Sequence, residues 1–513
     1  VIFSRCEIHK INGINGHKYG GVHFHQWKVG LLNASQKYLT AETFGFKVNA
    51  SGTALKKKQT WTLEQDLTEE VVYIKSHLNR YMAADKYGTV TCEAEEKDED
   101  PSQKFAVEYA KDGSGRWAIR NVVHGNYLTG NDDNVKCFSK SVTDGELWFG
   151  QLSIHPQVNL YNVNRKRYAR LCDDELQVTA VIPWGQESLI ILHFEDGKYA
   201  LKTSDDRFLH REGHLVNALE EDAKFSLEIR SGANSGLAFR DNAGTYLTAV
   251  GATATMKGRN KTVGKDELFT LEDTKPQVVL TAYNGKKVSI KQGQDVSANQ
   301  EEEEGETEIF QMEYVKESDM WAFRTCSNKY WSYESGGGIM NVGNEICKNT
   351  LFDVEWQGDG SVTIKASNNN YIFNKPTGCL FALSESATEK EKFKVKMVNR
   401  PAIILRSEYG FVGLKSFQKP EYNCNKTCYE PIFLEPQENG FYGLKGNNGK
   451  YWGLNEESHV FADKDMPVNF LLEFRKQDII TIKAPNGMYL KGEQNGLFRA
   501  KGEDLDAGML WEC

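Results

Sequence analysis

The sequence predicts an all-β protein, and three observations support this fold class. A short phrase recurs twelve times along the chain, with intervals of 38 to 46 residues between the central positions of successive copies. Between the copies, Val, Ile, Phe and Tyr alternate with polar residues, which is the period of a half-buried strand. No amphipathic segment exceeds about two helical turns. The repeat is therefore built from strands rather than from pairs of helices.

The recurring phrase begins in most copies with Lys, Arg or Asn, continues with an aromatic or apolar residue, and ends with small or apolar residues. Gly, Asn and Asp mark the breaks between strands, as at Asn448-Gly449, and such pairs predict tight hairpins. The twelve central positions are Tyr38, Tyr81, Tyr127, Tyr168, Phe208, Tyr246, Val288, Tyr330, Tyr371, Phe411, Tyr451 and Tyr489.

A longer period groups the twelve copies into four sets of three. Each third copy is followed by a closing phrase, such as Glu146-Leu147-Trp148, and a Pro-containing strand such as His155-Pro156 opens the next set. Three repeats of about 40 residues closing one barrel are typical of the β-trefoil, whereas a propeller would not reset its boundary after every third blade. We therefore predict four tandem β-trefoil domains, with the repeated aromatics filling the barrel interiors. The predicted domains are 27–150, 151–275, 276–397 and 398–513, after an N-terminal tail at 1–26 that we expect to be flexible.

Composition and charge narrow the classes of function. Of the 513 residues, 40% are hydrophobic and 26% are charged, which is the balance of a globular chain. The net charge of -9 argues against a general nucleic-acid binder, so local basic patches must meet any anionic partner. No run approaches the roughly 18 apolar residues of a spanning helix, and residues 1–26 lack the apolar core of a secretory signal. We expect a cytoplasmic chain that does not insert into membranes.

The sequence predicts neither an enzyme nor a metal or cofactor site. The ten cysteines are scattered and are expected to be reduced thiols, and Cys424 and Cys428 lack a second ligand pair nearby. There is no H-E-x-x-H or G-x-S-x-G motif, and no Gly-Lys pair is followed by Ser or Thr. The eleven histidines form no obvious ligand set, and the acidic run at 301–304 is expected to be a solvated loop.

Segments from all four predicted trefoils closely resemble the fascin family, over essentially all of 27–513. The resemblance implies a monomer that cross-links parallel actin filaments in the cytoskeleton of filopodia and similar protrusions. Because one monomer must hold two filaments, at least two separated filament sites are expected. The matching segments are 37–42, 44–50, 55–59, 61–64, 155–159, 165–169, 263–269, 297–300 and 399–401.

Actin filaments are acidic, so basic groups are the first candidates for filament contact. Lys56, Lys57 and Lys58 form the densest basic run of the first trefoil, and a solvated hairpin edge is the structural alternative. Lys37 resembles a family residue in the same region, although it also fits a plain position of the repeat.

Two further groups of residues are candidates for filament contact. Glu408, Lys483 and Lys491 of the fourth trefoil resemble the surface that meets the first trefoil in one actin site, with a structural salt bridge as the alternative for Glu408. The second trefoil offers another site, with Arg167 also fitting a position of the repeat. Its candidates are Arg165, Lys166, Arg167, Lys261 and Lys265.

The basic run also resembles the phospho-regulated segment of the family, where added negative charge opposes binding to an acidic filament. Well-known members have serine directly before the leucine, and this chain has Ala54 before Leu55. Phosphorylation must therefore move to Ser51 or Thr53, or be absent.

A trefoil lectin or a heparin-binding module is the alternative function. Gln59-Thr60-Trp61 matches the Q-x-W phrase of ricin-like lectins, but only one of the twelve repeats carries it.

Overall fold

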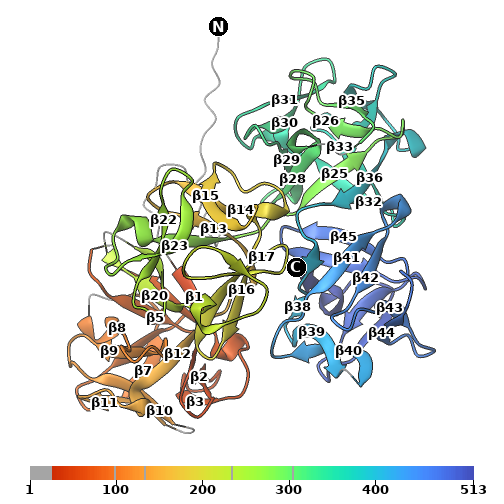
Figure 1. Ribbon diagram of the computed structural model, residues 1–513. Coiled ribbons are helices and arrows are strands. Elements are labelled where there is room, and N and C mark those ends of the chain that lie inside the picture. The colour runs from red at the N-terminus through yellow and green to blue at the C-terminus, as the bar shows by residue number, and fades with distance from the viewer. Residues whose placement is uncertain are drawn as a thin grey trace. The chain divides into compact units, whose positions relative to one another are not determined.

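The computed structural model describes residues 26–513, except 67, 98–99, 132–133, 233–234, 303–304 and 417 (Figure 1). The predicted tail at 1–26 lies outside the described residues, apart from Gln26. Strands, turns and short 3₁₀ helices make up the described chain, which confirms the all-β prediction. None of the helices in this part of the chain has the length and apolarity needed to cross a membrane.

The chain divides into two compact units, and its strands form four successive sheets that we call modules. Unit 1 comprises Val1–Ile154 and Leu227–Ala238, and unit 2 comprises His155–Ser226 and Phe239–Cys513. The first module belongs to unit 1, and the third and fourth belong to unit 2. The second module is in unit 2 except for Leu227–Ala238.

The first module is a sheet of 12 strands. They are β1 (Gln26–Leu32), β2 (Tyr38–Ala41), β3 (Val48–Gly52), β4 (Trp61–Gln65), β5 (Val72–Lys75), β6 (Tyr81–Ala84), β7 (Val90–Ala94), β8 (Phe105–Tyr109), β9 (Trp117–Asn121), β10 (Tyr127–Asn131), β11 (Asn134–Ser139) and β12 (Leu147–Leu152).

The second module also has 12 strands. They are β13 (Gln157–Asn162), β14 (Arg167–Cys172), β15 (Glu175–Ala180), β16 (Ile190–Glu195), β17 (Lys198–Thr203), β18 (Phe208–Leu209), β19 (Leu215–Val216), β20 (Ser226–Arg230), β21 (Gly236–Arg240), β22 (Tyr246–Val250), β23 (Thr255–Asn260) and β24 (Phe269–Asp273).

The third module repeats the pattern with 12 strands. They are β25 (Gln277–Thr281), β26 (Lys287–Ser289), β27 (Ser297–Gln300), β28 (Ile309–Val315), β29 (Met320–Arg324), β30 (Tyr330–Tyr333), β31 (Ile339–Gly343), β32 (Asp353–Trp356), β33 (Ser361–Lys365), β34 (Tyr371–Asn374), β35 (Leu380–Ser384) and β36 (Lys392–Met397).

The fourth module has 13 strands, because its opening segment is split in two. They are β37 (Ala402–Ile403), β38 (Arg406–Ser407), β39 (Gly410–Ser416), β40 (Lys419–Lys426), β41 (Ile432–Pro436), β42 (Tyr442–Lys445), β43 (Tyr451–Leu454), β44 (Val460–Lys464), β45 (Leu471–Lys476), β46 (Ile479–Lys483), β47 (Tyr489–Gly492), β48 (Phe498–Gly502) and β49 (Trp511–Glu512).

Six strands of the first module close a barrel. β1 pairs with β4 and β12, β5 pairs with β4 and β8, and β9 pairs with β8 and β12. The other six form the hairpins β2–β3, β6–β7 and β10–β11. The first and last strands also pair in the second and third modules, as β13–β24 and β25–β36. In the fourth module the second half of the split opening segment pairs with the last strand, as β38–β49. Four tandem β-trefoils are therefore confirmed, while the exact domain boundaries stay predictions.

Each of the twelve sequence phrases begins the first strand of a hairpin. In eleven of these hairpins the register shifts at the central position of the phrase, as in a β-bulge. Short 3₁₀ helices occur at similar intervals along the chain. Within the described residues they are η1 (Lys57–Gln59), η2 (Pro101–Gln103), η3 (Asp144–Glu146), η4 (Gln186–Ser188), η5 (Glu221–Ala223), η7 (Lys265–Glu267), η8 (Glu306–Glu308), η9 (Lys348–Thr350), η10 (Glu389–Glu391), η11 (Glu438–Gly440) and η12 (Ala507–Met509).

The expectation that the repeated aromatics fill the barrel interiors was wrong. Nine of the twelve central residues are only half-buried, whereas the residue that follows is 0% exposed in every copy, as for Leu39, Trp331 and Trp452. Successive side chains of a strand point to opposite faces, so the residue after the aromatic enters the core. The aromatic keeps its polar end near the edge of the module.

The phrase tyrosines share one polar interaction. In six copies the tyrosine hydroxyl donates a hydrogen bond to a carboxylate that lies one strand beyond its own paired strand, for example at 3.0 Å from Tyr81 on β6 to Glu64 on β4. A buried hydroxyl needs such a partner, and an ionised carboxylate gives a stronger bond than a neutral acceptor. The pairs are Tyr81–Glu64, Tyr127–Glu108, Tyr168–Glu272, Tyr330–Glu313, Tyr451–Glu435 and Tyr489–Glu473.

In three of these six copies, a lysine six residues before the tyrosine adds a cation–π contact. Lys75 pairs with Tyr81 across two strands, and its ammonium lies 5.3 Å from the centre of the ring. The same register places Lys483 over Tyr489 at 5.8 Å. A cation over an aromatic face is attracted by the ring quadrupole. These lysines are therefore partly engaged within their own module.

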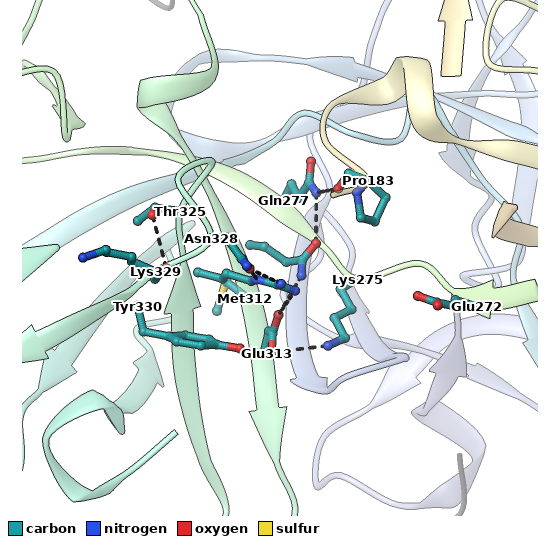
Figure 2. A network of polar contacts seen from close by, with 12 residues as sticks. Pro183, Glu272, Lys275, Gln277, Met312, Glu313, Thr325, Asn328, Lys329 and Tyr330 are labelled. Atoms are coloured by element: carbon teal, nitrogen blue, oxygen red, sulfur yellow. Dashed lines mark hydrogen bonds and ion pairs between the residues drawn. The ribbon is translucent and has the colours of Figure 1, made fainter. Parts of the chain in front are cut away.

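Figure 2 shows the most extensive of these polar contacts, around Glu313 in the third module. Glu313 is only 5% exposed, and its carboxylate accepts hydrogen bonds from Gln311 at 2.7 Å and Tyr330 at 3.1 Å. Lys275 and Arg324 form ion pairs with it at 3.3 and 3.5 Å. Burial opposes ionisation, but the two cations outweigh it and hold the pKa of Glu313 below its usual range.

The same network joins the third module to the second. Gln277 Nε2 donates to the Pro183 carbonyl at 2.9 Å and to Gln311 Oε1 at 3.0 Å (Figure 2). The amide of Gly185 donates a hydrogen bond to Gln277 Oε1 at 2.8 Å. Within unit 2, the side chain of Gln277 therefore fixes the second module against the first strand of the third.

Hydrogen bonds also join the fourth module to the rest of unit 2. Trp356 Nε1 donates to the Phe474 carbonyl at 3.0 Å, which links the third and fourth modules. His155 Nε2 lies 2.8 Å from the Ile404 carbonyl, to which it must donate, and this bond links the second and fourth modules. One hydrophobic core continues through the third and fourth modules.

We expect Glu313→Ala to destabilise unit 2 by about 3 kcal/mol, because it leaves two cations near a buried site without their anion. The lower midpoint of guanidinium unfolding, followed by tryptophan fluorescence, measures this loss. Glu317→Ala is the matched control, since Glu317 is exposed on the same hairpin. Equal midpoints for the two variants would contradict the structural role of Glu313.

His155 gives unit 2 a predicted dependence on pH. Burial lowers the pKa of His155 from 6.5 to about 4, because the imidazolium cannot be solvated there. Between these values the unfolded chain binds more protons than the folded chain, so the free energy of unfolding falls as the pH falls. The full shift corresponds to about 3 kcal/mol. His155→Gln should flatten this slope between about pH 6.5 and 4 in denaturant titrations, and an unchanged slope would refute the assignment.

Candidate functional site

The lysine run of the first module lies on the 3₁₀ helix η1, between β3 and β4. The carbonyl of Lys56 accepts the amide of Gln59 at 2.9 Å and the hydroxyl of Thr60 at 3.1 Å. Gln59 is buried, and its Nε2 donates to Thr40 Oγ1 at 3.1 Å. The run is therefore held on a hydrogen-bonded turn anchored to β2, and not on the edge of a hairpin.

The three lysines of this turn are all exposed, but they differ in availability. Lys58 Nζ pairs with Glu42 Oε2 at 2.9 Å, and this bond is the main reason that the pKa of Glu42 is lowered. Among the described residues, Lys56 and Lys57 have no ion-pair partner. Burial, with Lys57 and Lys58 nearby, lowers the pKa of His77, so this imidazole adds no positive charge.

The other first-module candidates lie around this turn. Lys37 is half-buried at the start of β2, where its amide donates to Asn33 Oδ1 at 2.9 Å. No hydrogen bond or ion pair joins it to the lysine run in the part of the chain that is described. Ser51 and Thr53 are exposed, and the Ser51 hydroxyl donates to Asn49 Oδ1 at 2.7 Å.

The second-module candidates come together on two adjacent turns of unit 2. The turn at 163–166 leads into β14, whose first residue is Arg167, and η7 follows β23. Asn164 Nδ2 donates to Asp266 Oδ1 at 2.6 Å, and Asn162 Nδ2 donates to the Asp266 carbonyl at 2.8 Å. Asparagine side chains therefore fasten the arginine-rich turn to the helix that begins with Lys265.

The cations on these turns are exposed. Lys166 sits at the apex with a φ of 53°, and Arg165 Nη2 donates to the Ala249 carbonyl at 3.0 Å. Neither Lys261 nor Lys265 forms an ion pair with any described residue. We call this group, with Arg167 and Arg259, the second-module basic surface.

Arg259 was missed by the sequence analysis. It is exposed near the end of β23, two residues before Lys261. The spacing of basic residues at 257, 259 and 261 was the available signal in the sequence.

The candidate lysines of the fourth module already have contacts within the chain, so they are less available to an external partner. Lys491 pairs with Asp506 at 2.5 Å, and Lys483 is half-buried over the Tyr489 ring. Glu408 is exposed and is the main reason that the pKa of Tyr409 is raised. Asp506 contributes to the same shift. The structure thus gathers Glu408 and Lys491 in one neighbourhood, but neither lysine is a free cation.

Comparison with known proteins agrees with the four-module organisation. The model of the fascin domain matches residues 35–149, 158–271, 283–395 and 419–513. Fascin-2 of Bos taurus is 41% identical over 491 residues, which cover 94% of this chain and 97% of the relative. Fascin-2 of Homo sapiens is 40% identical with the same coverage, and the fascin of Strongylocentrotus purpuratus is 35% identical over 95% of this chain and 99% of the relative. The chain belongs to the fascin family.

Fascins are structural proteins that bundle actin and are not enzymes. Membership of the family therefore confirms the prediction that this chain is not an enzyme. The residues that suggested a lectin are not available to bind a sugar. Trp61 is completely buried and donates to the Leu39 carbonyl at 2.9 Å, and Gln59 is buried against Thr40. The Q-x-W phrase of this fascin therefore stabilises the core and is not exposed to a sugar.

The sequence predicted no set of histidine ligands, but the structure brings two histidines and a glutamate together at one place. His210, Glu212 and His214 have potential ligand atoms within 4.8 Å of one another. Cys6, His9, His17, His23, His25, Glu303 and Glu304 lie outside the described residues, and the nine described cysteines are all free thiols.

Proposed function

We propose that this chain cross-links actin filaments into parallel bundles through at least two basic surfaces. One surface is the lysine turn of unit 1, and the other is the second-module basic surface of unit 2. The chain acts as a single copy in the cytoplasm, within protrusions such as filopodia. The observation that carries the proposal is that each unit holds exposed cations without ion-pair partners among the described residues, on turns fixed by hydrogen bonds.

Charge complementarity supports this mechanism. A filament surface rich in carboxylates attracts cations, and fixed turns present those cations with little loss of conformational freedom. Lys56, Lys57, Lys166 and Lys265 meet both conditions. Lys58, Lys483 and Lys491 already have internal partners, so they contribute less unless binding breaks those contacts.

The resistance of unit 2 to bending supports bundling in particular. A cross-linker holds two filaments at a fixed spacing only if its domains do not move freely. The hydrogen bonds of Gln277, His155 and Trp356 connect three modules within unit 2. Such buried and partly buried polar contacts favour one packing arrangement, because leaving a buried one unmade is costly.

Separate substitutions at the two surfaces should uncouple binding from bundling. We expect Lys56→Glu/Lys57→Glu and Lys166→Glu/Lys265→Glu each to reduce actin pelleting at low speed about tenfold, since charge reversal replaces attraction by repulsion. High-speed co-sedimentation should persist in both, because one surface remains. Combining all four substitutions should abolish it.

Lys86→Glu/Lys136→Glu is the matched control, because both residues are exposed lysines of the first module outside the lysine turn. This variant carries the same change in net charge and should still bundle filaments. Unimpaired bundling by either test variant would overturn the assignment of its surface, and co-sedimentation by the fourfold variant would overturn the electrostatic mechanism.

Negative charge at Thr53 should weaken filament binding, because Thr53 precedes Lys56 by three residues and is exposed. We expect Thr53→Glu to lower the salt concentration at which half of the bundling is lost, relative to Thr53→Gln. Ser51→Glu should have a similar effect but also breaks the bond to Asn49. Identical salt midpoints for Thr53→Glu and Thr53→Gln would exclude regulation at this position.

A further inference from the structure

A tight turn of the second module gathers two histidines and a glutamate. β18 and β19 pair through Leu209 and Leu215, and the five residues between them form the turn. The His210 amide donates to the His214 carbonyl at 2.9 Å, and the Gly213 amide donates to the His210 carbonyl at 2.9 Å. These bonds fix the two histidines across the turn from each other.

Glycine makes this turn possible. Gly213 has a φ of 101°, a conformation that side chains disfavour. A Cβ there would also lie 3.2 Å from the Met256 carbonyl and from Lys257 Cβ on β23. The turn is held from outside as well, because the Gly258 amide donates to the Arg211 carbonyl at 2.7 Å. The position of the turn is therefore set by the module and not by its own side chains.

The two imidazoles are close and almost parallel. Their ring centres are 4.2 Å apart, with an angle of 27° between the rings. His210 is 8% exposed, while Glu212 and His214 are exposed beside it. Potential ligand atoms of the three side chains lie within 4.8 Å of one another. Bonds of about 2.1 Å to one tetrahedral ion require separations of roughly 3.4 Å, so small side-chain rotations would be enough.

A second carboxylate orients His210. Its Nδ1 accepts the Glu212 amide at 3.2 Å, so this nitrogen carries no proton, and an ion bound there would replace this amide hydrogen bond. Its Nε2 lies 3.7 Å from Asp222 Oδ2. Asp222 is fixed in turn by Asn242 at 2.5 Å and by Arg211 at 3.3 Å. A carboxylate behind a histidine is the arrangement that fixes the tautomer of metal-binding imidazoles.

We propose that His210, Glu212 and His214 form a binding site for one Zn²⁺ ion, with water as the fourth ligand. Two imidazole nitrogens and one carboxylate suit Zn²⁺ and related transition ions, whereas Ca²⁺ and Mg²⁺ prefer oxygen ligands alone. The proposal does not depend on the function proposed above, since the turn contains none of the residues assigned to filament contact.

Isothermal titration calorimetry of the full chain with zinc chloride tests the site. We expect His214→Gln and Glu212→Gln each to weaken one binding event about tenfold or more, because each removes a ligand. Both side chains are exposed, so the fold should persist, and circular dichroism checks this. Magnesium chloride should give no corresponding heat.

Two control variants distinguish this site from other histidines of the chain that could bind zinc. His124→Gln removes a histidine of unit 1, and His23→Gln/His25→Gln removes two histidines near the N-terminus. Both should leave the event at the turn unchanged. The proposal is overturned if the unmodified chain binds no zinc, or if His214→Gln and Glu212→Gln titrate like the unmodified chain.

Discussion

The fold depends on one pairing in each module, that of its first strand with its last. In the first module this pairing brings Val29 opposite Leu152, and in the third it brings Val278 opposite Met397. It closes the barrel strands of the module into a ring. It also brings the two ends of a module together, so short connections lead from one barrel to the next. Four barrels in tandem follow from a chain that repeats this closure four times.

The sequence was sufficient for the fold class because closure needs a regular repeat, and the twelve phrases are regular. It was not sufficient for the contents of the barrels. Tyrosine and the residue after it are both large in many copies, so hydrophobicity alone does not say which one is inside. In the tyrosine copies the hydroxyl also needs a polar partner, and that partner is distant in some copies. Glu272 lies 104 residues from Tyr168, and no local pattern indicates it.

The candidate surfaces were found from the density of basic residues and from the family resemblance. The sequence could not show which of their cations are already paired within the chain. Lys58 and Glu42 are 16 residues apart, and Lys491 and Asp506 are 15 apart, so each pair forms only because a hairpin or turn folds back. His210 and His214 came together for the same reason. In an extended strand, two histidines four residues apart would not be in contact. The turn at Gly213 brings their rings face to face.

Availability matters because electrostatic attraction in the cell is short-ranged. At physiological salt, exposed charges are largely screened beyond about 8 Å, so a net charge of -9 does not prevent one face from attracting an acidic filament. What counts is the charge that remains within that distance after internal pairing. Lys57 keeps its full charge for a partner, whereas Lys58 shares its charge with Glu42. A bundling protein with an excess of acidic residues is therefore physically consistent, provided that its unpaired cations are grouped on fixed turns and that its modules do not move against one another.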